Sequence, residues 1–205
     1  MTASPEARAY HHGDLRGALL EQAIASINAV GVEHLSLRAV AAAVGVSPSA
    51  AYHHFSDKDA LIDAVKDRGF EQLDAYIEES ISSNRAEFSD TTQARQIMTT
   101  GAIAYINFAI DHPHWFAIMF SGAKDTTKLP HMESALAHLR DLFMSLRGIS
   151  AEEEELTEEV LMASVHGIAA LVVDGRMDRD RVPAAIEVLT KLLIGPMVEV
   201  TGGRP

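Results

Sequence analysis

The chain has 205 residues, of which 47% are hydrophobic and 22% charged, proportions typical of a globular protein with a substantial core. It contains no cysteine, which excludes disulfides, thiolate zinc sites and a cysteine nucleophile. The net charge of −12 argues against a nucleic-acid partner, but the charge is uneven: residues 1–70 hold six Lys and Arg against eight Asp and Glu, so most of the acidity lies later.

The sequence shows neither a targeting segment nor a membrane helix. The N-terminal stretch, MTASPEARAYHHGDL, lacks the apolar core of a signal peptide. No uncharged apolar run approaches the ~20 residues that span a bilayer. We therefore expect a cytoplasmic protein with no membrane partner.

Apolar residues recur with helical spacing along nearly the whole chain, and no strand alternation extends beyond a few residues. Gly31 and Gly45 are suitable helix stops, and Ser47 followed by Pro48 is a suitable helix start. The sequence therefore predicts an all-α fold. The expected helices occupy residues 15–30, 37–44, 48–55, 58–77, 91–110, 131–147, 151–174 and 183–197, with a short apolar segment at 115–120.

Residues 36–59, SLRAVAAAVGVSPSAAYHHFSDKD, form the most informative pattern. Two short helices are joined by a tight turn. Ala41 is small where the helices would cross, and Gly45 can adopt the positive φ that the turn needs. This spacing is typical of a helix-turn-helix motif, whose second helix can lie in the major groove of DNA. An ordinary αα-hairpin within a helical bundle is the alternative, because the pattern is short.

The run from HHGDLRGALLEQAI through LSLRAVAAAVGVSPSAAYHHFSDKDALIDAV resembles the N-terminal domain of TetR-family transcriptional regulators. The resemblance covers roughly residues 11–65. Several independent positions match in order, which is more specific than a generic helix-turn-helix. The matching residues are a serine before the second helix, Arg38, Ala41, Gly45, Val46, Ser47, Tyr52, Phe55, Lys58 and Leu61.

This resemblance implies a homodimeric regulator with a three-helix DNA-binding domain at residues 1–58 and a helical effector-binding and dimerisation domain at residues 59–205. In the later part, HPHWFAIMF and VHGIAALVVDG are similar to a C-terminal domain type known for its Trp, His and Gly, here Trp115, His166 and Gly167. We therefore expect a repressor of a pseudo-palindromic, double-stranded operator. An unidentified small molecule would release it, with no cofactor and no catalytic residues.

The resemblance also implies roles for residues of the helix-turn-helix. Phosphate contacts are expected from Ser36, Arg38, Tyr52, His53 and Lys58, and base contacts from Ser47, Ser49 and Ala50. Hydroxyls, a phenol and helix N-terminal N–H groups are good phosphate donors. The recognition helix departs from expectation because it has no Lys or Arg, so it cannot make the common Arg-to-guanine contact. Base discrimination must then rest on small side chains, on Arg38 or on DNA shape.

Aromatic and methionine side chains gather in the second half of the chain. They can be plain core, or some of them can line an effector pocket, which methionine suits because its side chain adapts to varied ligands. His166 lies among apolar helix positions and is either a hydrogen-bonded core histidine or a polar anchor for an effector. The candidate pocket residues are Tyr105, Phe108, Trp115, Met119, Phe143, Met162 and His166.

The two last expected helices carry apolar residues together with small ones that allow close helix approach. Two such helices from each subunit resemble the two-fold, four-helix interface of the family. Packing within one chain is the alternative, and part of each helix must serve it. The candidate interface residues are Leu156, Val160, Ala163, Gly167, Ala170, Ile186, Leu189 and Leu193.

Two other function classes stay open. The missing basic residues on the recognition helix would also fit a small-molecule-binding helical protein whose DNA-binding domain has lost its function. The second class is an enzyme such as a metal-assisted hydrolase, but the sequence shows no nucleophile–base pair and no Gly-rich phosphate loop. The histidines lack the i, i+4 spacing of a helical metal pair, so we expect no metal site.

Overall fold

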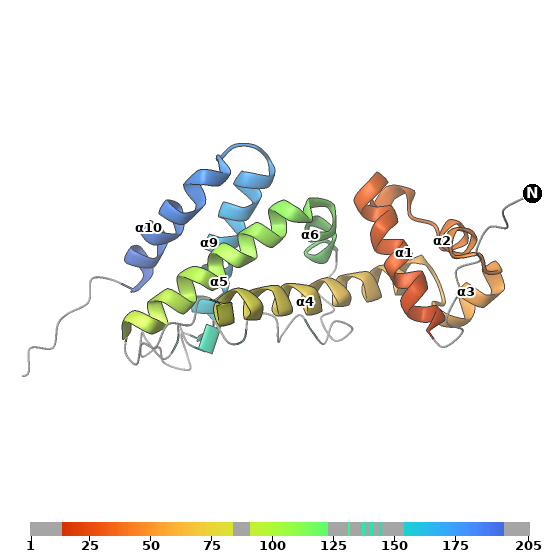
Figure 1. Cartoon of the computed structure of the whole chain (residues 1–205), viewed down its shortest axis with the longest axis horizontal. Helices are drawn as coiled ribbons and strands as arrows, with labels where there is room; N and C mark the ends of the chain where they lie inside the picture. The colour runs from red at the N-terminus through yellow and green to blue at the C-terminus, as the bar shows by residue number, and fades with distance from the viewer. Residues whose placement is uncertain are drawn as a thin grey trace, which may run out of the picture. The chain divides into compact units, whose positions relative to one another are not determined.

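Figure 1 shows the computed structural model, which describes residues 14–83, 91–122, 131, 137, 140, 141, 144 and 154–194. Within these residues all regular structure is helical, which confirms the all-α prediction. The helices are α1 (Leu15–Val30), α2 (Leu37–Val44), α3 (Pro48–His54), α4 (Lys58–Ser83), α5 (Thr91–Asp111), α6 (Pro113–Met119), α9 (Glu154–Val173) and α10 (Val182–Ile194), with 3-10 turns η1 (Val32–His34) and η3 (Arg179–Arg181).

The chain divides into two compact units, residues 1–66 and 67–205, and the division falls within α4. In the first unit, α1, α2 and α3 pack together (Figure 1). Ala41 and Ala51 have no exposed surface, so α2 and α3 approach each other and α1 closely. Gly45 ends α2 at φ +83°, and the N–H of Val46 donates to the carbonyl of Ala41 at 2.9 Å. The predicted positive φ is therefore confirmed, since an L side chain is strained there.

Side-chain caps fix two of the helix starts. The Asp14 carboxylate accepts a hydrogen bond from the Gly17 N–H at 2.8 Å, and the Ser47 hydroxyl oxygen accepts one from the Ala50 N–H at 3.2 Å. Ser36 occupies the N-cap position of α2, but its side chain makes no capping bond within the described part of the chain. The Ser36 hydroxyl is therefore not used to cap α2.

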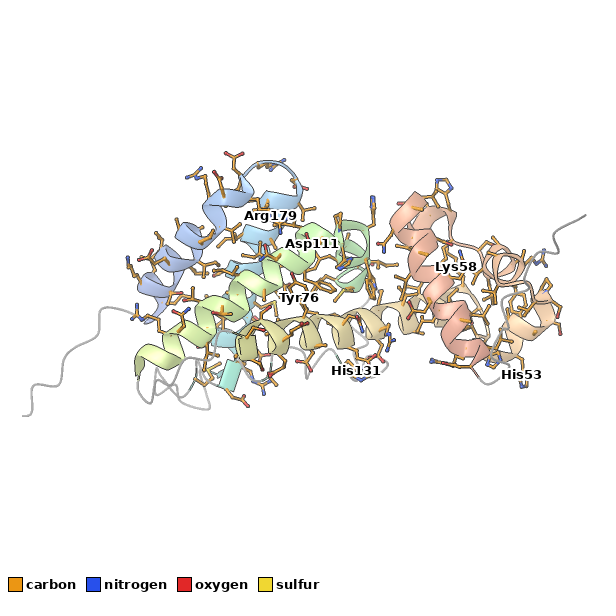
Figure 2. The ribbon with its side chains drawn as sticks, in the orientation of Figure 1. His53, Lys58, Tyr76, Asp111, His131 and Arg179 are labelled. Carbon is orange, nitrogen blue, oxygen red and sulfur yellow. The ribbon has the colours of Figure 1, made fainter. Side chains whose placement is uncertain are left out.

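In the second unit, α5 is the central helix, with α6, α9 and α10 packed against it (Figure 1). The segment at 115–120 forms most of α6, which starts from Pro113 at its first position, where the missing N–H costs little. The guanidinium of Arg179 in η3 donates hydrogen bonds to the side chains of Asp111 and Asn107 in α5, each at 3.3 Å. Figure 2 labels Arg179 and Asp111.

Gly69 allows α4 and α6 to approach each other. A Cβ atom at this position would lie 2.6 Å from Cγ and Sδ of Met119 and 2.9 Å from Nε1 of Trp115. We expect Gly69→Ala to lower the midpoint of thermal unfolding, because overpacking costs ~1–3 kcal/mol and outweighs the ~1 kcal/mol that alanine adds to helix propensity. Gln72→Ala, at an exposed position of the same helix, is the control in circular-dichroism melts. An unchanged or raised midpoint for Gly69→Ala would contradict the tight packing.

Candidate DNA-binding face and effector cavity

The two sides of α3 differ sharply. Ala51 is fully buried and Phe55, directly after the helix, is 3% exposed. Ser47, Ser49 and His53 are exposed, Ala50 is half-buried and Tyr52 is 43% exposed. Figure 2 shows His53 projecting from α3. The structure thus brings all five predicted contact residues of this helix to its accessible side.

Two more predicted contact residues are exposed at the start of α2. Ser36 and Arg38 are exposed, whereas Leu37 and Val40 are buried in the core of the unit. The alternation follows from the helix phase: the apolar residues face α1 and α3, which leaves the hydroxyl and the guanidinium outside. The arrangement can present hydroxyl, phenol, imidazole and guanidinium groups to a nucleic-acid backbone.

Lys58 has a structural contact that the sequence did not predict. Its ammonium donates a hydrogen bond to the carbonyl oxygen of Val32 at 3.1 Å and is partly buried. Lys58 therefore ties the start of α4 to η1, and only part of its three-donor capacity is used by this bond. Next to it, the Asp57 carboxylate caps α4 by accepting from the Ala60 N–H at 2.7 Å.

Arg16 is a second cation close to the end of α3, a helix that itself contains no Lys or Arg. The guanidinium carbon of Arg16, an exposed residue of α1, lies 5.2 Å from the centroid of the Phe55 ring. This is a cation–π distance, and it holds a positive charge next to the end of α3. Sequence reasoning missed Arg16 because it precedes Phe55 by 39 residues. The LRGALL stretch alone gives no sign of the contact.

A cavity of about 70 Å³ lies in the second unit. Tyr105 and Met162 belong to the predicted pocket set and line it. The other described lining residues are Met98, Ala102, Arg140, Glu158, Leu161 and Val165. Phe143 lies outside the described residues.

Three predicted pocket residues lie in the core instead. Phe108, Trp115 and Met119 are 2%, 7% and 2% exposed. Phe108 packs its ring 6.0 Å from Trp115 and 6.0 Å from Tyr76, the latter labelled in Figure 2. They are not among the described lining residues of this cavity, so their assignment to an effector pocket stays a prediction.

His166 lies half-buried in an aromatic cage. Its Nδ1 is 2.9 Å from the Tyr105 hydroxyl, its ring stacks on Phe116 at 5.1 Å, and Phe120 meets it edge-on at 4.7 Å. Burial lowers the pKa of His166, and burial raises the pKa of the Tyr105 phenol well above its ordinary value. Both groups are therefore uncharged at neutral pH. His166 is thus a hydrogen-bonded histidine whose partner, Tyr105, lines the cavity, and its role as a polar anchor for an effector stays a prediction.

The charged part of the cavity wall is an ion pair that sequence reasoning missed. The Arg140 guanidinium lies 3.8 Å from the Glu158 carboxylate and 3.0 Å from that of Asp141. Arg140 and Glu158 are 18 residues apart, so their spacing gave no signal. In the same unit, Asp67 of α4 accepts a hydrogen bond from the backbone N–H of His131, labelled in Figure 2, at 3.0 Å and lies 2.9 Å from its Nδ1.

Comparison with protein-family models identifies both parts of the chain. Residues 19–65 match the model of bacterial regulatory proteins of the tetR family. Residues 98–195 match the tetracyclin repressor-like C-terminal domain. The chain belongs to the TetR family. It is thus a DNA-binding transcriptional regulator, while the Trp-His-Gly subtype of its C-terminal domain stays a prediction.

Solved structures have the same fold. A protein of unknown function from Rhodococcus sp. RHA1 is 27% identical, with a TM-score of 0.73 over 92% of this chain and 97% of that one. A TetR-like regulator from the same organism is 19% identical, with a TM-score of 0.60 over 87% and 92%. BioQ, solved with its double-stranded DNA operator, is 18% identical, with a TM-score of 0.62 over 87% and 97%. A search of curated protein sequences finds no match.

This TetR-family protein exposes apolar residues on α9 and α10. Leu156, Val160, Val188 and Leu192 are 64%, 48%, 56% and 77% exposed. Two shallow apolar grooves, of about 210 and 410 Å³, include these side chains. Of the other predicted interface residues, Ala163 and Gly167 are exposed, and Ala170, Leu189 and Leu193 are half-buried.

One predicted interface residue is in the wrong place. Ile186 is 1% exposed, because it shares a face of α10 with Val182 and Thr190, one turn away on either side, and this face packs inside the unit. The exposed face of α10 carries Val188 and Leu192 instead, which sequence reasoning missed. Both faces of α10 carry apolar residues, so the sequence alone does not show which face is buried.

The window Leu156–Val173 in α9 is long and apolar enough to cross a membrane by length and composition, although it includes Glu158 and Glu159. Only 6% of this window is buried. In the TetR-family protein one side of α9 packs against α5 and the exposed side carries Leu156 and Val160. A helix that packs on one side within its own chain and on the other against a second chain has this same composition.

Proposed function

We propose that the protein is a homodimeric repressor of a pseudo-palindromic operator and that a small effector bound in the C-terminal cavity releases it from DNA. The observation that carries the DNA-binding part is the split of α3 into a buried side and a polar, exposed side. We assign DNA contact to residues 1–58, and effector binding and dimerisation to residues 59–205. Such a protein acts on chromosomal DNA, so we place it in the cytoplasm.

On DNA, the polar side of α3 would enter the major groove, with Ser47, Ser49 and Ala50 at the base edges. Tyr52 and His53 would bind phosphates on one side, and the exposed Ser36 and Arg38 would bind them on the other. Arg16 and Lys58 support this proposal because they supply the cations that α3 lacks. The structure of BioQ with its operator supports the same mode of binding by fold.

Dimerisation would use the exposed faces of α9 and α10, which then form a four-helix interface with a second copy. A two-fold arrangement would place two α3 helices on successive turns of the major groove, ~34–36 Å apart. The exposed Leu156, Val160, Val188 and Leu192 support this interface, because a contiguous apolar surface of this kind marks a contact with another protein.

Effector binding would act by favouring a dimer whose α3 spacing does not fit the operator. An effector shifts that equilibrium only by its difference in affinity for the two states. The cavity beside Tyr105 and Met162 supports this part of the proposal, because it lies apart from the DNA-binding unit and within the matched C-terminal domain.

Substitutions on the polar side of α3 test DNA binding directly. We expect Tyr52→Phe and His53→Ala each to weaken operator binding about 5- to 10-fold, the loss of roughly one hydrogen bond of ~1 kcal/mol. Arg38→Ala should also reduce the salt slope of log K by about one unit, as for the loss of one phosphate contact. The upstream DNA of the protein's own gene is the probe, in fluorescence-anisotropy titrations at several salt concentrations.

The matched control is His114→Ala, which removes an exposed histidine from the C-terminal unit and should leave DNA affinity unchanged. If Tyr52→Phe, His53→Ala and Arg38→Ala behaved like this control, the helix-turn-helix would not contact DNA. A ligand-binding protein without DNA-binding function would then be the better description, as the absence of Lys and Arg from α3 suggests.

A further inference from the structure

The cavity wall is mostly hydrocarbon and thioether. Met98 and Ala102 of α5 face Leu161, Met162 and Val165 of α9 across it. Such a wall binds a molecule by burying its apolar surface, which contributes about 25 cal/mol per Å². Met98 and Met162 add side chains that adapt their shape to the ligand. The body of the ligand must therefore be apolar.

Among the described lining residues, the positive charge is already paired with carboxylates: Arg140 lies near Glu158 and also 3.0 Å from Asp141. Arg140 and Glu158 are the two ionised residues among the described lining residues, and their side chains lie 3.8 Å apart. An anion would have to compete with two carboxylates for Arg140, and a cation would have to compete with Arg140 for Glu158, in a space from which water is partly excluded. The cost is large for any charge taken out of water without compensation. The wall therefore disfavours both anions and cations.

Tyr105, one of the lining residues, forms an uncharged hydrogen-bonding pair with His166, which lies behind it outside the described lining. Tyr105 follows Met98 by seven residues on α5, ~10.5 Å along the helix axis, and its hydroxyl lies 2.9 Å from Nδ1 of His166. Burial keeps the phenol protonated and the imidazole neutral. If the hydroxyl donates to Nδ1, its oxygen can accept from a ligand; with the other imidazole tautomer, the hydroxyl can donate to a ligand. The pair thus serves a ligand hydroxyl or carbonyl equally well.

We propose that the effector is an uncharged small molecule with a hydrocarbon body and one hydroxyl or carbonyl oxygen, which Tyr105 binds with the support of His166. The oxygen lies at the Tyr105 end, and the body extends along Met98, Ala102, Leu161 and Val165 toward the Arg140–Glu158 pair. This inference rests on the proposed function only in naming the cavity as the effector site, and it concerns the chemistry of that site alone.

Three probes with the same six-carbon body test the charge of the ligand: 1-hexanol, hexanoate and hexylammonium. Their dissociation constants for the full-length protein are measured by saturation-transfer NMR at neutral pH. We expect 1-hexanol to bind at least tenfold more tightly than either ion, because each ion meets a wall whose opposite charge is already paired. Equal or tighter binding of hexanoate or hexylammonium, or no binding of any probe, would overturn the proposal.

Two variants test the residues. Tyr105→Phe keeps the ring and should raise the dissociation constant of 1-hexanol about fivefold or more through the lost hydrogen bond. Tyr76→Phe is the matched control. Tyr76 packs against Phe108 on the α4 side of α5, so this substitution should have no effect on 1-hexanol binding.

Glu158→Gln leaves Arg140 with one carboxylate fewer and should raise the affinity for hexanoate about tenfold. An unchanged hexanoate affinity in Glu158→Gln would contradict the charge compensation.

Operator affinity measured in the same samples separates this inference from the proposed function. If 1-hexanol binds as expected but saturation leaves operator affinity unchanged, the ligand class holds and effector-driven release fails. If hexanoate or hexylammonium binds more tightly and lowers operator affinity, effector-driven release stands and the ligand class is wrong. Loss of 1-hexanol binding in Tyr105→Phe with a normal thermal midpoint shows that the hydroxyl, and not the fold, is responsible.

Discussion

Leu192→Asp is expected to turn the proposed dimer into monomers and to abolish operator binding at nanomolar protein concentration. Leu192 is 77% exposed in the single chain, so the substitution removes little packing inside the protomer. In a two-fold interface each substitution occurs twice. Losing the burial of two leucines costs about 4 kcal/mol, or ~10³-fold in the dimer dissociation constant, before the desolvation of two carboxylates is counted.

Sedimentation velocity measures this change, and circular dichroism checks that the helix content is unchanged. The matched control is Val30→Asp, which places the same charge on another exposed apolar residue, 57% exposed, at the end of α1. Val30→Asp should remain dimeric. A dimeric Leu192→Asp would show that the apolar faces of α9 and α10 serve something other than self-association.

Phe55→Ala is expected to unfold the N-terminal unit. The side chain is 3% exposed, it follows α3 directly, and its ring lies beneath the guanidinium of Arg16. Removing a buried phenylalanine costs ~3–5 kcal/mol. Since whole domains have stabilities of about 5–15 kcal/mol, this loss takes most of the stability available to a small helical unit.

Differential scanning calorimetry of Phe55→Ala should show an early transition for the N-terminal unit and a later one for the rest of the chain. Tyr52→Ala is the comparison from the same helix. Tyr52 is 43% exposed, so we expect a thermal midpoint close to that of the unchanged protein together with weaker DNA binding. A normal thermal midpoint for Phe55→Ala would contradict this expectation. It would show that the buried ring contributes little to the stability of the N-terminal unit.

The helix-turn-helix could be predicted closely because its signals are local. Gly45 ends α2 in the left-handed region, and Ser47 with Pro48 starts α3, within a span of four residues. Ala51 within α3 and Phe55 directly after the helix are both buried, and they fix which side of α3 faces the core. Short-range rules of capping and periodicity decide such features, and little long-range packing competes with them.

The cavity and the exposed apolar face of α10 could not be predicted in the same way. Arg140 meets Glu158, and Tyr105 meets His166, across distances in sequence that carry no periodic signal. On α10, Ile186 and Leu192 are both apolar, yet one faces the core and the other faces outward. An apolar residue in the sequence indicates that the side chain tends to be buried, but it does not indicate whether the same chain or another molecule buries it. Only the packed structure shows which face of α10 points to the core.

The close approach of α4 and α6 at Gly69 gives the protein an optical probe of its own. Trp115 is the single tryptophan of the chain, and it is 7% exposed in the contact that Gly69 allows. Its fluorescence therefore comes from one known place, and a buried indole emits at shorter wavelength than one in water. Any rearrangement that separates α4 from α6 would shift that emission to the red, so the protein can report it without a label.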